Sequence, residues 1–395
     1  MVLEAATVGH GASGRNGGLV VPSLPRVGPD DAIRALGAAG ERLVTLVLAA
    51  PGEVFHLIRS HGIDCGAVQA GWLNPAHAAA LVPALERRLA DWRRYGSTAT
   101  LLDSIETRCR IGSDRFFAAI ADPSGGHLNP LAYTNGLARA AAAAGARVHE
   151  QSRVVSVQRQ GSGWRLQLAA ATVTAEQVLQ ATNAEVPDIA PAQAVGKSVV
   201  PLIIYELATA VQSDDVRATL LPGDEAMSDT RNNLFACCWD GTGRLVTGGM
   251  APLTQVGAPS WLPRLLARRL ARIFPQLAST GFTHVWRGRA ALTGDFLPRI
   301  FEPARGWLAP ISCNGRGIAL STAMGPCLAE FLLTRDASCL PAPISRPKPL
   351  PLSAFAGKVP QLLLPLGMLA DWRAERRRTA DRAHPPNREH PVRKQ

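Results

Sequence analysis

Cysteine is sparse and scattered in this chain of 395 residues, and its pattern excludes a metal module. The seven cysteines form no C-x-x-C pair and show no Cys/His spacing of the kind that ligates zinc. An odd, dispersed set in a long chain is typical of reduced, mostly buried thiols in a reducing compartment. We therefore expect a cytoplasmic protein without a bound metal. The cysteines are Cys65, Cys109, Cys237, Cys238, Cys313, Cys327 and Cys339.

Long apolar runs are also missing. No positively charged segment followed by an apolar one opens the sequence, so no signal peptide is predicted. The longest candidate run, residues 359–370, covers about 12 residues, whereas a membrane-spanning helix needs about 20. Pro360, Pro365 and Gly367 interrupt that run. The sequence therefore predicts no membrane span.

Lysine is rare, with four residues in the whole chain, although the net charge is +11. Residues 371–395 contain eight Arg or Lys against four Asp or Glu, so +4 of the excess belongs to the proline-containing tail. The remaining arginines are scattered, and no basic stripe alternates with aromatic residues as a nucleic-acid groove requires. This distribution excludes nucleic acid as the expected partner. An apolar content of 47% and this length favour an α/β protein with two domains.

A phosphate-binding loop in its usual position is missing as well. Met1-Val2-Leu3 is typical of a short strand, and Glu4 follows it directly. In a dinucleotide-binding domain, an acid at the end of the second strand binds the ribose hydroxyls, and Glu4 occupies the corresponding position. The glycine-rich loop should lie about 20 residues earlier. Residues 9–14 fit G-x-G-x-x-G, but no buried strand precedes them and the residues that follow are poor helix formers. The acid, Glu4, also comes before these glycines, whereas it should follow them by about 20 residues. Use of residues 9–14 by NAD(P) stays open as an alternative.

The order of helices and strands predicts a nucleotide-binding half with a β insertion, followed by an inserted antiparallel sheet. Asn129 caps a helix that Pro130 begins and Gly145 ends, and two short alternating runs around residues 161–163 form a hairpin. Apolar periodicity predicts helices elsewhere, and β-branched runs predict strands. Predicted helices cover residues 31–60, 76–95, 260–274 and 318–333, and predicted strands cover residues 154–157, 164–168, 177–180, 199–204, 233–236 and 245–249.

Several short motifs occur in an order that characterises one family. Residues 12–18 read ASGRNGG and follow Glu4, residues 181–184 read ATNA, and residues 314–318 read NGRGI. Residues 286–288 read WRG, and residues 293–295, TGD, come before Pro298. This ordered set resembles FAD-dependent amine and amino-acid oxidoreductases of the D-amino-acid oxidase/glycine oxidase superfamily, over roughly residues 1–335. The SGRNGG and NGRGI forms are most similar to the gamma-glutamylputrescine oxidoreductase-like branch.

The resemblance implies a non-covalent FAD site and the residues that form it. Glu4 would bind the ribose hydroxyls, and the backbone at Val154 would contact the adenine. The loop over residues 12–18 would supply hydrogen-bond donors near the pyrophosphate and the flavin ring. The start of the helix after residue 314 would face the flavin's pyrimidine edge, where negative charge appears on reduction. Residues 286–293 contain no cysteine that could tether FAD. The implied cofactor-binding residues are Glu4, Ser13, Arg15, Asn16, Gly17, Gly18, Val154, Thr182, Asn183, Gly315, Arg316, Gly317 and Ile318.

The implied reaction is hydride transfer from the carbon that carries the amine to flavin N5, followed by imine hydrolysis, because no ordinary side chain accepts a hydride. The substrate would be a small amine or amino acid. No catalytic residue is named, and His284, Trp286 and Arg299 are candidates for shaping the pocket. The structural alternative for each of these three is a role in packing.

The implied fold is a Rossmann-like FAD-binding domain that lacks its first βα unit, together with an antiparallel substrate domain. The expected FAD-binding domain comprises residues 1–60, 120–198 and 290–345. The expected substrate domain comprises residues 61–119 and 199–289. Residues 346–395 would form a C-terminal extension whose end is disordered. Because the first strand of a doubly wound sheet lies at its centre, its loss predicts weak FAD binding or none. A start site upstream of Met1 explains this departure, and a truncated, non-catalytic remnant is the alternative.

Overall fold

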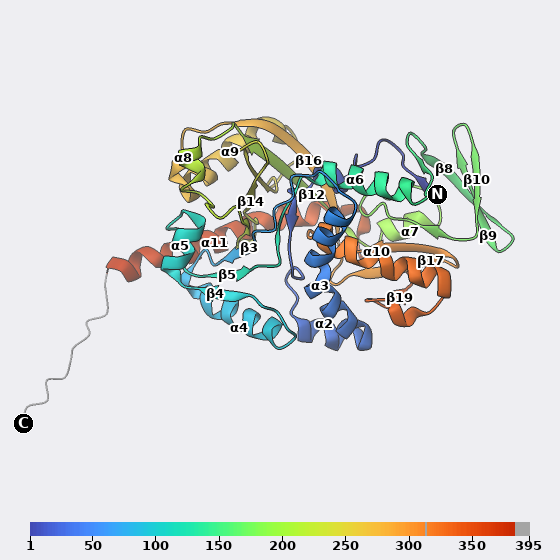
Figure 1. The fold of residues 1–395 in the computed structure, drawn as a ribbon, viewed down its shortest axis with the longest axis horizontal. Coiled ribbons are helices and arrows are strands. Elements are labelled where there is room, and N and C mark those ends of the chain that lie inside the picture. The colour runs from blue at the N-terminus through green and yellow to red at the C-terminus, as the bar shows by residue number, and fades with distance from the viewer. Residues whose placement is uncertain (313, 384–395) are drawn as a thin grey trace, which may run out of the picture.

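The computed structural model describes residues 1–312 and 314–383. One half of the molecule contains a large sheet, and the other half contains smaller sheets and the longest buried helices (Figure 1). Cys313 and the end of the expected C-terminal extension, residues 384–395, lie outside the described residues.

The large sheet has eight strands in the order β16-β12-β15-β14-β13-β3-β5-β4. Its pairings are antiparallel except for β13 with β3. Both segments of the expected substrate domain supply strands to it. The strands are β3 (Trp72–Pro75), β4 (Thr100–Leu102), β5 (Ala119–Asp122), β12 (Val200–Thr209), β13 (Ala226–Ser228), β14 (Ala236–Trp239), β15 (Leu245–Gly249) and β16 (Phe282–Leu292).

Helix α9 (Ala258–Ile273) covers one face of this sheet. Its buried residues Leu262 and Leu266 lie one helical turn apart and pack with Tyr205 and Leu207 of β12. Successive side chains of a strand point to opposite faces, so Glu206, between these two residues, points to the face away from α9. That second face is turned toward the other half of the molecule.

The other half is organised around α3 (Ala38–Ser60) and α10 (Gly317–Thr334), which pack against each other. Leu43 and Val47 of α3 share a buried cluster with Met324 and Leu328 of α10. By length and composition alone, α3 and α10 are also the two helices among the described residues that are apolar enough to cross a membrane. Their apolar residues supply the core of this half, a role that the sequence analysis did not identify for them.

The parallel strands of this half form two separate sheets among the described residues. Strand β1 (Val2–Leu3) pairs only with β7 (Val148–His149), while β11 (Val178–Leu179) pairs only with β18 (Trp307–Ile311). Strand β18 continues to β17 (Arg299–Ala304) and β19 (Ile344–Ser345). Val2 and Leu179 are 47% and 40% exposed. Each of the two sheets therefore ends in a short strand with an apolar residue open to solvent.

The remaining elements connect these layers. The predicted hairpin after α6 is confirmed as part of a three-stranded sheet, β10-β9-β8. These elements are α1 (Ala12–Arg15), β2 (Leu19–Val20), α2 (Pro29–Leu36), α4 (Val82–Arg93), α5 (Ser104–Ile111), β6 (Gly126–His127), α6 (Pro130–Ala143), β8 (Val154–Gln160), β9 (Gly163–Leu168), β10 (Thr172–Ala175), α7 (Ala192–Gly196) and α8 (Asp214–Arg217).

Several predicted elements have different bounds in the structure. The helix expected over residues 76–95 becomes an α-helix only at Val82, and the strand expected over residues 199–204 extends to Thr209. The helix expected over residues 31–60 divides into α2 and α3 at Gly37, whose φ is 59°. The strand expected over residues 233–236 begins only at Ala236, as β14. The side-chain Oδ1 of Asn233 accepts a hydrogen bond from the backbone N–H of Met250, 3.0 Å away, which holds residue 233 in a loop.

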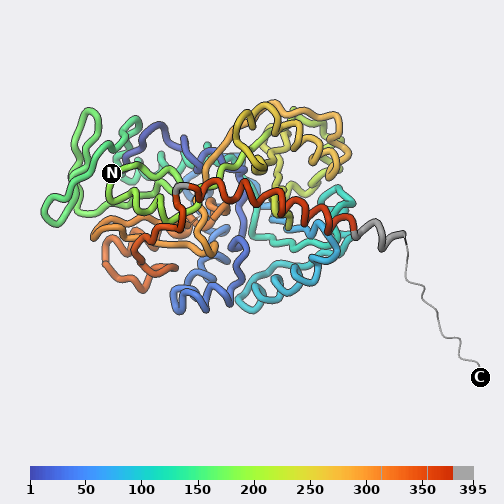
Figure 2. Tube along the Cα trace, turned by 180° about the vertical axis from the view of Figure 1, so that it is seen from behind, coloured from blue at the N-terminus to red at the C-terminus, as the bar shows by residue number. Residues whose placement is uncertain are grey.

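A long C-terminal helix, α11 (Val359–Ala383), occupies much of the segment that the sequence analysis treated as an extension with a disordered end. Figure 2 shows it lying across the back of the molecule and ending on the large-sheet half. Asp371 accepts hydrogen bonds from the backbone and side-chain N–H groups of Asn232 at 2.9 and 2.8 Å. Glu375 forms an ion pair with Arg231 at 2.8 Å. These tertiary contacts stabilise a helix that its prolines disfavour locally.

Candidate functional site

The loop over residues 12–18 has a conformation that its own side chains determine. The Asn16 side chain donates to the carbonyl oxygens of Ala12 and Ser13 at 3.0 and 2.9 Å and accepts from the Gly18 N–H at 2.9 Å. Gly18 has a φ of 81°, and a Cβ atom there would collide with the backbone oxygen of Leu128. The preceding helix α1 has four residues, and no side chain caps its N-terminus. The loop is therefore a fixed turn whose backbone is held close to its neighbours.

Strand β16 holds this loop against the large sheet. The indole Nε1 of Trp286 donates to the backbone oxygen of Arg15 at 2.9 Å. The Arg15 guanidinium donates in return to the backbone oxygen of Arg287 at 3.3 Å. The WRG and SGRNGG motifs, which are about 270 residues apart, thus contact each other. Ser13, the other predicted donor of the loop, is exposed.

The same strand contacts the segment that follows β11. The Asn183 side-chain oxygen accepts a hydrogen bond from the backbone N–H of Ala291 at 2.9 Å. Asn183 has a φ of 49°, and the neighbouring Thr182 is exposed. Both residues lie beyond the carboxyl end of a parallel strand, where ligands gather in open α/β sheets.

The turn before α10 has the geometry of a site for an electron-rich group. Asn314 is buried, and its Oδ1 accepts from the backbone N–H and the hydroxyl of Thr293 at 2.8 and 3.1 Å. Its Nδ2 is buried without a hydrogen-bond partner among the described residues. A Cβ at Gly315 would meet no atom within 4 Å, and no side chain caps α10, which begins at Gly317. The unpaired Nδ2 of Asn314 and the free N–H groups at the start of this 18-residue helix could both donate hydrogen bonds to an electron-rich group. They favour the binding of an anion, or of the edge of a flavin ring, at this turn.

Arg316 points inward from this turn, toward the segment after the first loop. Its guanidinium donates to the hydroxyl of Ser23 and, at 3.2 Å, to the backbone oxygen of Leu24. Arg88 of α4 donates to the same hydroxyl at 3.2 Å. Burial and then the nearby Arg88 lower the pKa of Arg316 to about 9, and no ion pair of either arginine occurs among the described residues. The Arg316 guanidinium therefore binds inside the fold, at the segment that contains Ser23 and Leu24.

Glu4 and Val154 form a second, separate group near β1 and β7. The Glu4 carboxylate accepts a hydrogen bond from the Ala6 N–H at 2.8 Å, and its backbone oxygen accepts from the Ser152 N–H at 2.7 Å. Val154 is the first residue of β8. The structure thus brings the predicted cofactor-binding residues into two groups, one at the end of β1 and one along β16 and the start of α10.

Glu206 is a residue of this region that the sequence analysis missed. Its two carboxylate oxygens lie 3.3 and 3.4 Å from the position that a Cβ of Gly17 would occupy. Burial raises its pKa to about 8. The signal was present in the sequence, because Glu206 is the single charged residue of the apolar strand over residues 200–209.

The three residues proposed to shape the pocket have different surroundings. Trp286 reaches the loop at Arg15, as described above. His284 is exposed, and its Nδ1 lies 2.9 Å from the hydroxyl of Thr283. Arg299 forms an ion pair with Asp295. Only the indole of Trp286 among the three therefore contacts a predicted cofactor-binding residue.

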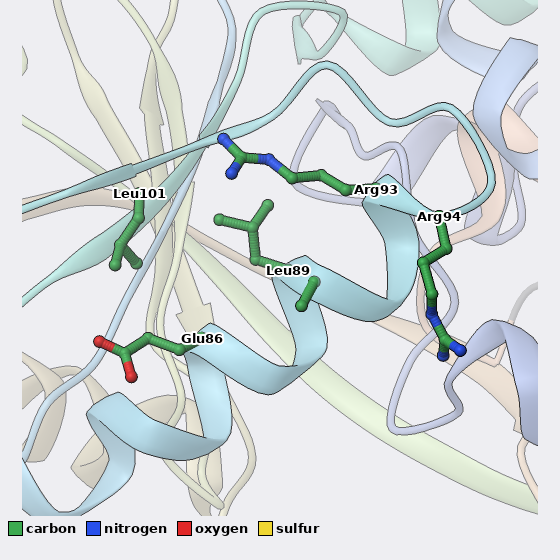
Figure 3. Close-up of a pocket in the computed structure, with 6 residues that line it drawn as sticks. Glu86, Leu89, Arg93, Arg94 and Leu101 are labelled. Carbon is green, nitrogen blue, oxygen red and sulfur yellow. The ribbon is translucent and has the colours of Figure 1, made fainter.

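A surface hollow lies away from both groups. Figure 3 shows it between α4 and β4, with Arg93 and Arg94 at one end and Glu86 at the other. Its volume is about 560 Å³. It contains no predicted site residue. A second cavity, beside Ser23 and Arg88, has a volume of about 20 Å³, room for about one water molecule. No group of three or more His, Cys, Asp or Glu that could hold a metal occurs in residues 1–312 and 314–383.

Comparisons with known proteins agree with this arrangement. The family described as FAD dependent oxidoreductase matches residues 1–331. The gamma-glutamylputrescine oxidoreductase of Escherichia coli is 30% identical over 334 residues, which cover 84% of this chain and 77% of the relative. The glycine oxidase of Geobacillus kaustophilus is 25% identical over 375 residues, 91% of each chain, and its crystal structure superposes with a TM-score of 0.67 over 84% of this chain and 87% of that one. The protein therefore belongs to the FAD-dependent oxidoreductase family.

Proposed function

We propose that this protein oxidises the C–N bond of a small amine with FAD as the electron acceptor. The observation that carries the proposal is the match of residues 1–331 to the family, joined with the open turn before α10 and its orphan donor Asn314. When bound, FAD would accept the hydride from the amine-bearing carbon, and water would then hydrolyse the imine. The 30% identity to an enzyme named for gamma-glutamylputrescine favours an amine over an α-amino acid as substrate.

The chain's own residues would orient the cofactor. The start of α10 would donate N–H groups of Gly317 and Ile318 to the flavin's pyrimidine edge, and the loop with Arg15, Asn16 and Gly17 would lie beside the ring. Thr182 and Asn183 would contact the cofactor at the end of β11. Glu4 would bind the ribose and Val154 the adenine. We propose that binding is non-covalent, because no cysteine stands in residues 286–293.

The separation of β1 from β11 bears on how firmly FAD would be held. We propose that full affinity needs one further strand with its glycine-rich loop between these two strands, since each has one partner among the described residues. The exposed Val2 and Leu179 support this view, because the helix that follows such a strand would cover a face of the sheet. A chain without that strand would be the non-catalytic alternative.

The partner would be a small molecule, because the scattered arginines form no nucleic-acid groove. We place the protein in the cytoplasm, with α3 and α10 as core helices that do not span a membrane. The division into an FAD-binding domain and a substrate domain at the stated boundaries is also part of this proposal. Use of NAD(P) at residues 9–14 is less favoured, since α1 offers only four residues for the phosphate.

The test is an absorbance spectrum of the purified chain, alone and with any in-frame upstream codons restored. Flavin bands near about 375 and 450 nm are expected in the extended chain. Bands in the extended chain alone would support the missing strand, and bands in both would show that the described residues suffice. Bands in neither, even after added FAD, would contradict an FAD enzyme.

A further inference from the structure

Two glycines make room for the carboxylate of Glu206 between the large sheet and the first loop. Glu206 pairs across the sheet with Gly248 of β15, where a Cβ would collide with the Oε2 of Glu206. On the loop side, the carboxylate lies against Gly17. A side chain at either glycine would displace the carboxylate. The fold thus holds an acid at the junction of the loop and the face of the sheet that is turned away from α9.

This carboxylate has no partner in the described part of the chain. No hydrogen bond or ion pair of the Glu206 side chain occurs there, and the residue keeps partial access to solvent. Burial alone accounts for its raised pKa, of about 8. Placing an acid in such surroundings is unfavourable unless a cation or donor completes the site.

The groups around Glu206 do not supply that cation. On β14, the Cys238 thiol donates to the Gly17 backbone oxygen at 3.4 Å, and burial raises its pKa well above the usual range, so it stays neutral. On α1, Arg15 donates to the backbone of Arg287, whose own side chain is exposed on β16. The nearby β16 residue His284 is exposed as well.

An aromatic ring stands beside the carboxylate. Trp286 is the direct cross-strand partner of Glu206, so the two side chains lie on the same face of the sheet. The indole is anchored by its bond to Arg15. A carboxylate next to an indole is a combination that recognises an alkylammonium ion, through charge and through the ring's electron-rich face.

From this geometry we propose that Glu206 binds the ammonium group of the substrate, with Trp286 as its neighbour, and that the enzyme prefers cationic amines to amino acids. The inference rests on the proposed amine oxidation and adds the residue that selects for charge. It assigns Glu206 a binding role. Before a hydride can leave the amine-bearing carbon, the ammonium nitrogen must lose one proton, which the Glu206 carboxylate beside it can accept.

The proposal predicts a proton balance. With a pKa of about 8 in the free protein, most Glu206 carboxyl groups carry a proton at pH 7. A bound ammonium ion stabilises the carboxylate, so binding should release close to one proton at pH 7 and almost none at pH 9. A simple alkylammonium, with a pKa near about 10.4, keeps its own proton at pH 7.

The test is anaerobic calorimetric titration of the FAD-loaded protein, extended upstream if FAD requires it, with n-butylammonium in buffers of different ionisation enthalpy. Wild type should release most of one proton at pH 7, and its affinity should rise with pH, by up to about tenfold per pH unit, below the pKa of Glu206. Butyrate should not compete. Glu206→Gln should bind n-butylammonium about 10- to 100-fold more weakly at pH 9 and release no proton. Glu206→Asp should retain proton release, and the exposed Glu330→Gln should behave as wild type.

Each outcome decides the inference. Absence of n-butylammonium binding, binding without proton release, or unchanged release in Glu206→Gln would overturn it. If the Gln variant unfolds, Gly248→Ala provides a second probe, once circular dichroism shows that it folds. The added methyl group displaces the carboxylate without removing it, but it also meets the backbone oxygen of Tyr205 and therefore costs stability. Loss of proton release in Gly248→Ala is expected, and full retention would overturn the proposal. Failure of the proposed function has a different signature, namely a flavin that no amine reduces.

Discussion

The indole nitrogen of Trp286 lies 2.9 Å from the backbone oxygen of Arg15, and this bond joins the large sheet to the predicted flavin loop. Residues from the two expected domains thus meet at a single strand, β16. The same strand contacts Asn183 near its other end.

Trp286→Phe should lower the free energy of unfolding by about 1 kcal/mol, because it removes one hydrogen bond and leaves the carbonyl of Arg15 unpaired. Trp261→Phe is a matched control, since that indole also donates to a backbone carbonyl, that of Val256, but outside the site. Urea unfolding measures both. Weaker amine binding is expected in the Trp286 variant alone, and equal binding in both variants would contradict its place in the site.

Glu206→Gln should change stability in a pH-dependent way. In the unfolded chain the carboxyl ionises near 4.5, but in the fold it stays protonated up to about pH 8. The folded state therefore binds the extra proton between these values, and wild-type stability should fall as pH rises through this window. The variant, which has no such proton, should be more stable than wild type at pH 9 by an amount on the order of 5 kcal/mol. At pH 4 the two should agree, and a difference that does not vary with pH would contradict the raised pKa.

Gly18→Ala should destabilise the fold by more than about 2 kcal/mol, because the residue has a φ of 81° and a Cβ would strike the backbone oxygen of Leu128. Gly11→Ala, in the same loop, should be nearly neutral, since a Cβ there meets no atom within 4 Å. Thermal unfolding compares the two. If both variants lose similar amounts of stability, the contact with the Leu128 oxygen is not the cause of the loss at Gly18.

Asp371→Ala should loosen α11 from the large-sheet half, because Asp371 accepts two hydrogen bonds from Asn232. A loss of about 1–3 kcal/mol in unfolding free energy is expected for these charge-assisted bonds. Limited proteolysis should then cut within α11 before the rest of the chain. Glu330→Ala, an exposed change on α10, serves as the control. A protease pattern unchanged from wild type would indicate that α11 is held mainly by other contacts.

The sequence predicted the helices and strands with strong local signals and the family that their motifs characterise. The cap at Asn129 and the stop at Gly145 defined α6 closely, because Asn129 accepts from the Ala132 N–H as predicted. Helix α11 was missed, since Pro360 and Pro365 argue against a helix and the stabilising contacts with Arg231 and Asn232 are non-local.

The candidate site was predictable only in part, because its residues come together through non-local contacts. Motif order pointed to residues 12–18 and 314–318, but pairing across the sheet decides which side chain accompanies them. Glu206 could be flagged as a lone acid in an apolar strand, yet only its register with Gly248 and Trp286 shows where its carboxylate lies. Gly17 was expected to make room for a cofactor, and the structure shows that it also makes room for the Glu206 carboxylate.

The most direct test of the account is anaerobic titration of the FAD-loaded protein, extended upstream if FAD requires it, with n-butylammonium and with glycine while the flavin absorbance is followed. The account predicts loss of the band near about 450 nm with the alkylammonium, faster than with glycine. A band that neither compound bleaches would contradict the proposed amine oxidation. Faster bleaching by glycine would contradict the preference assigned to Glu206.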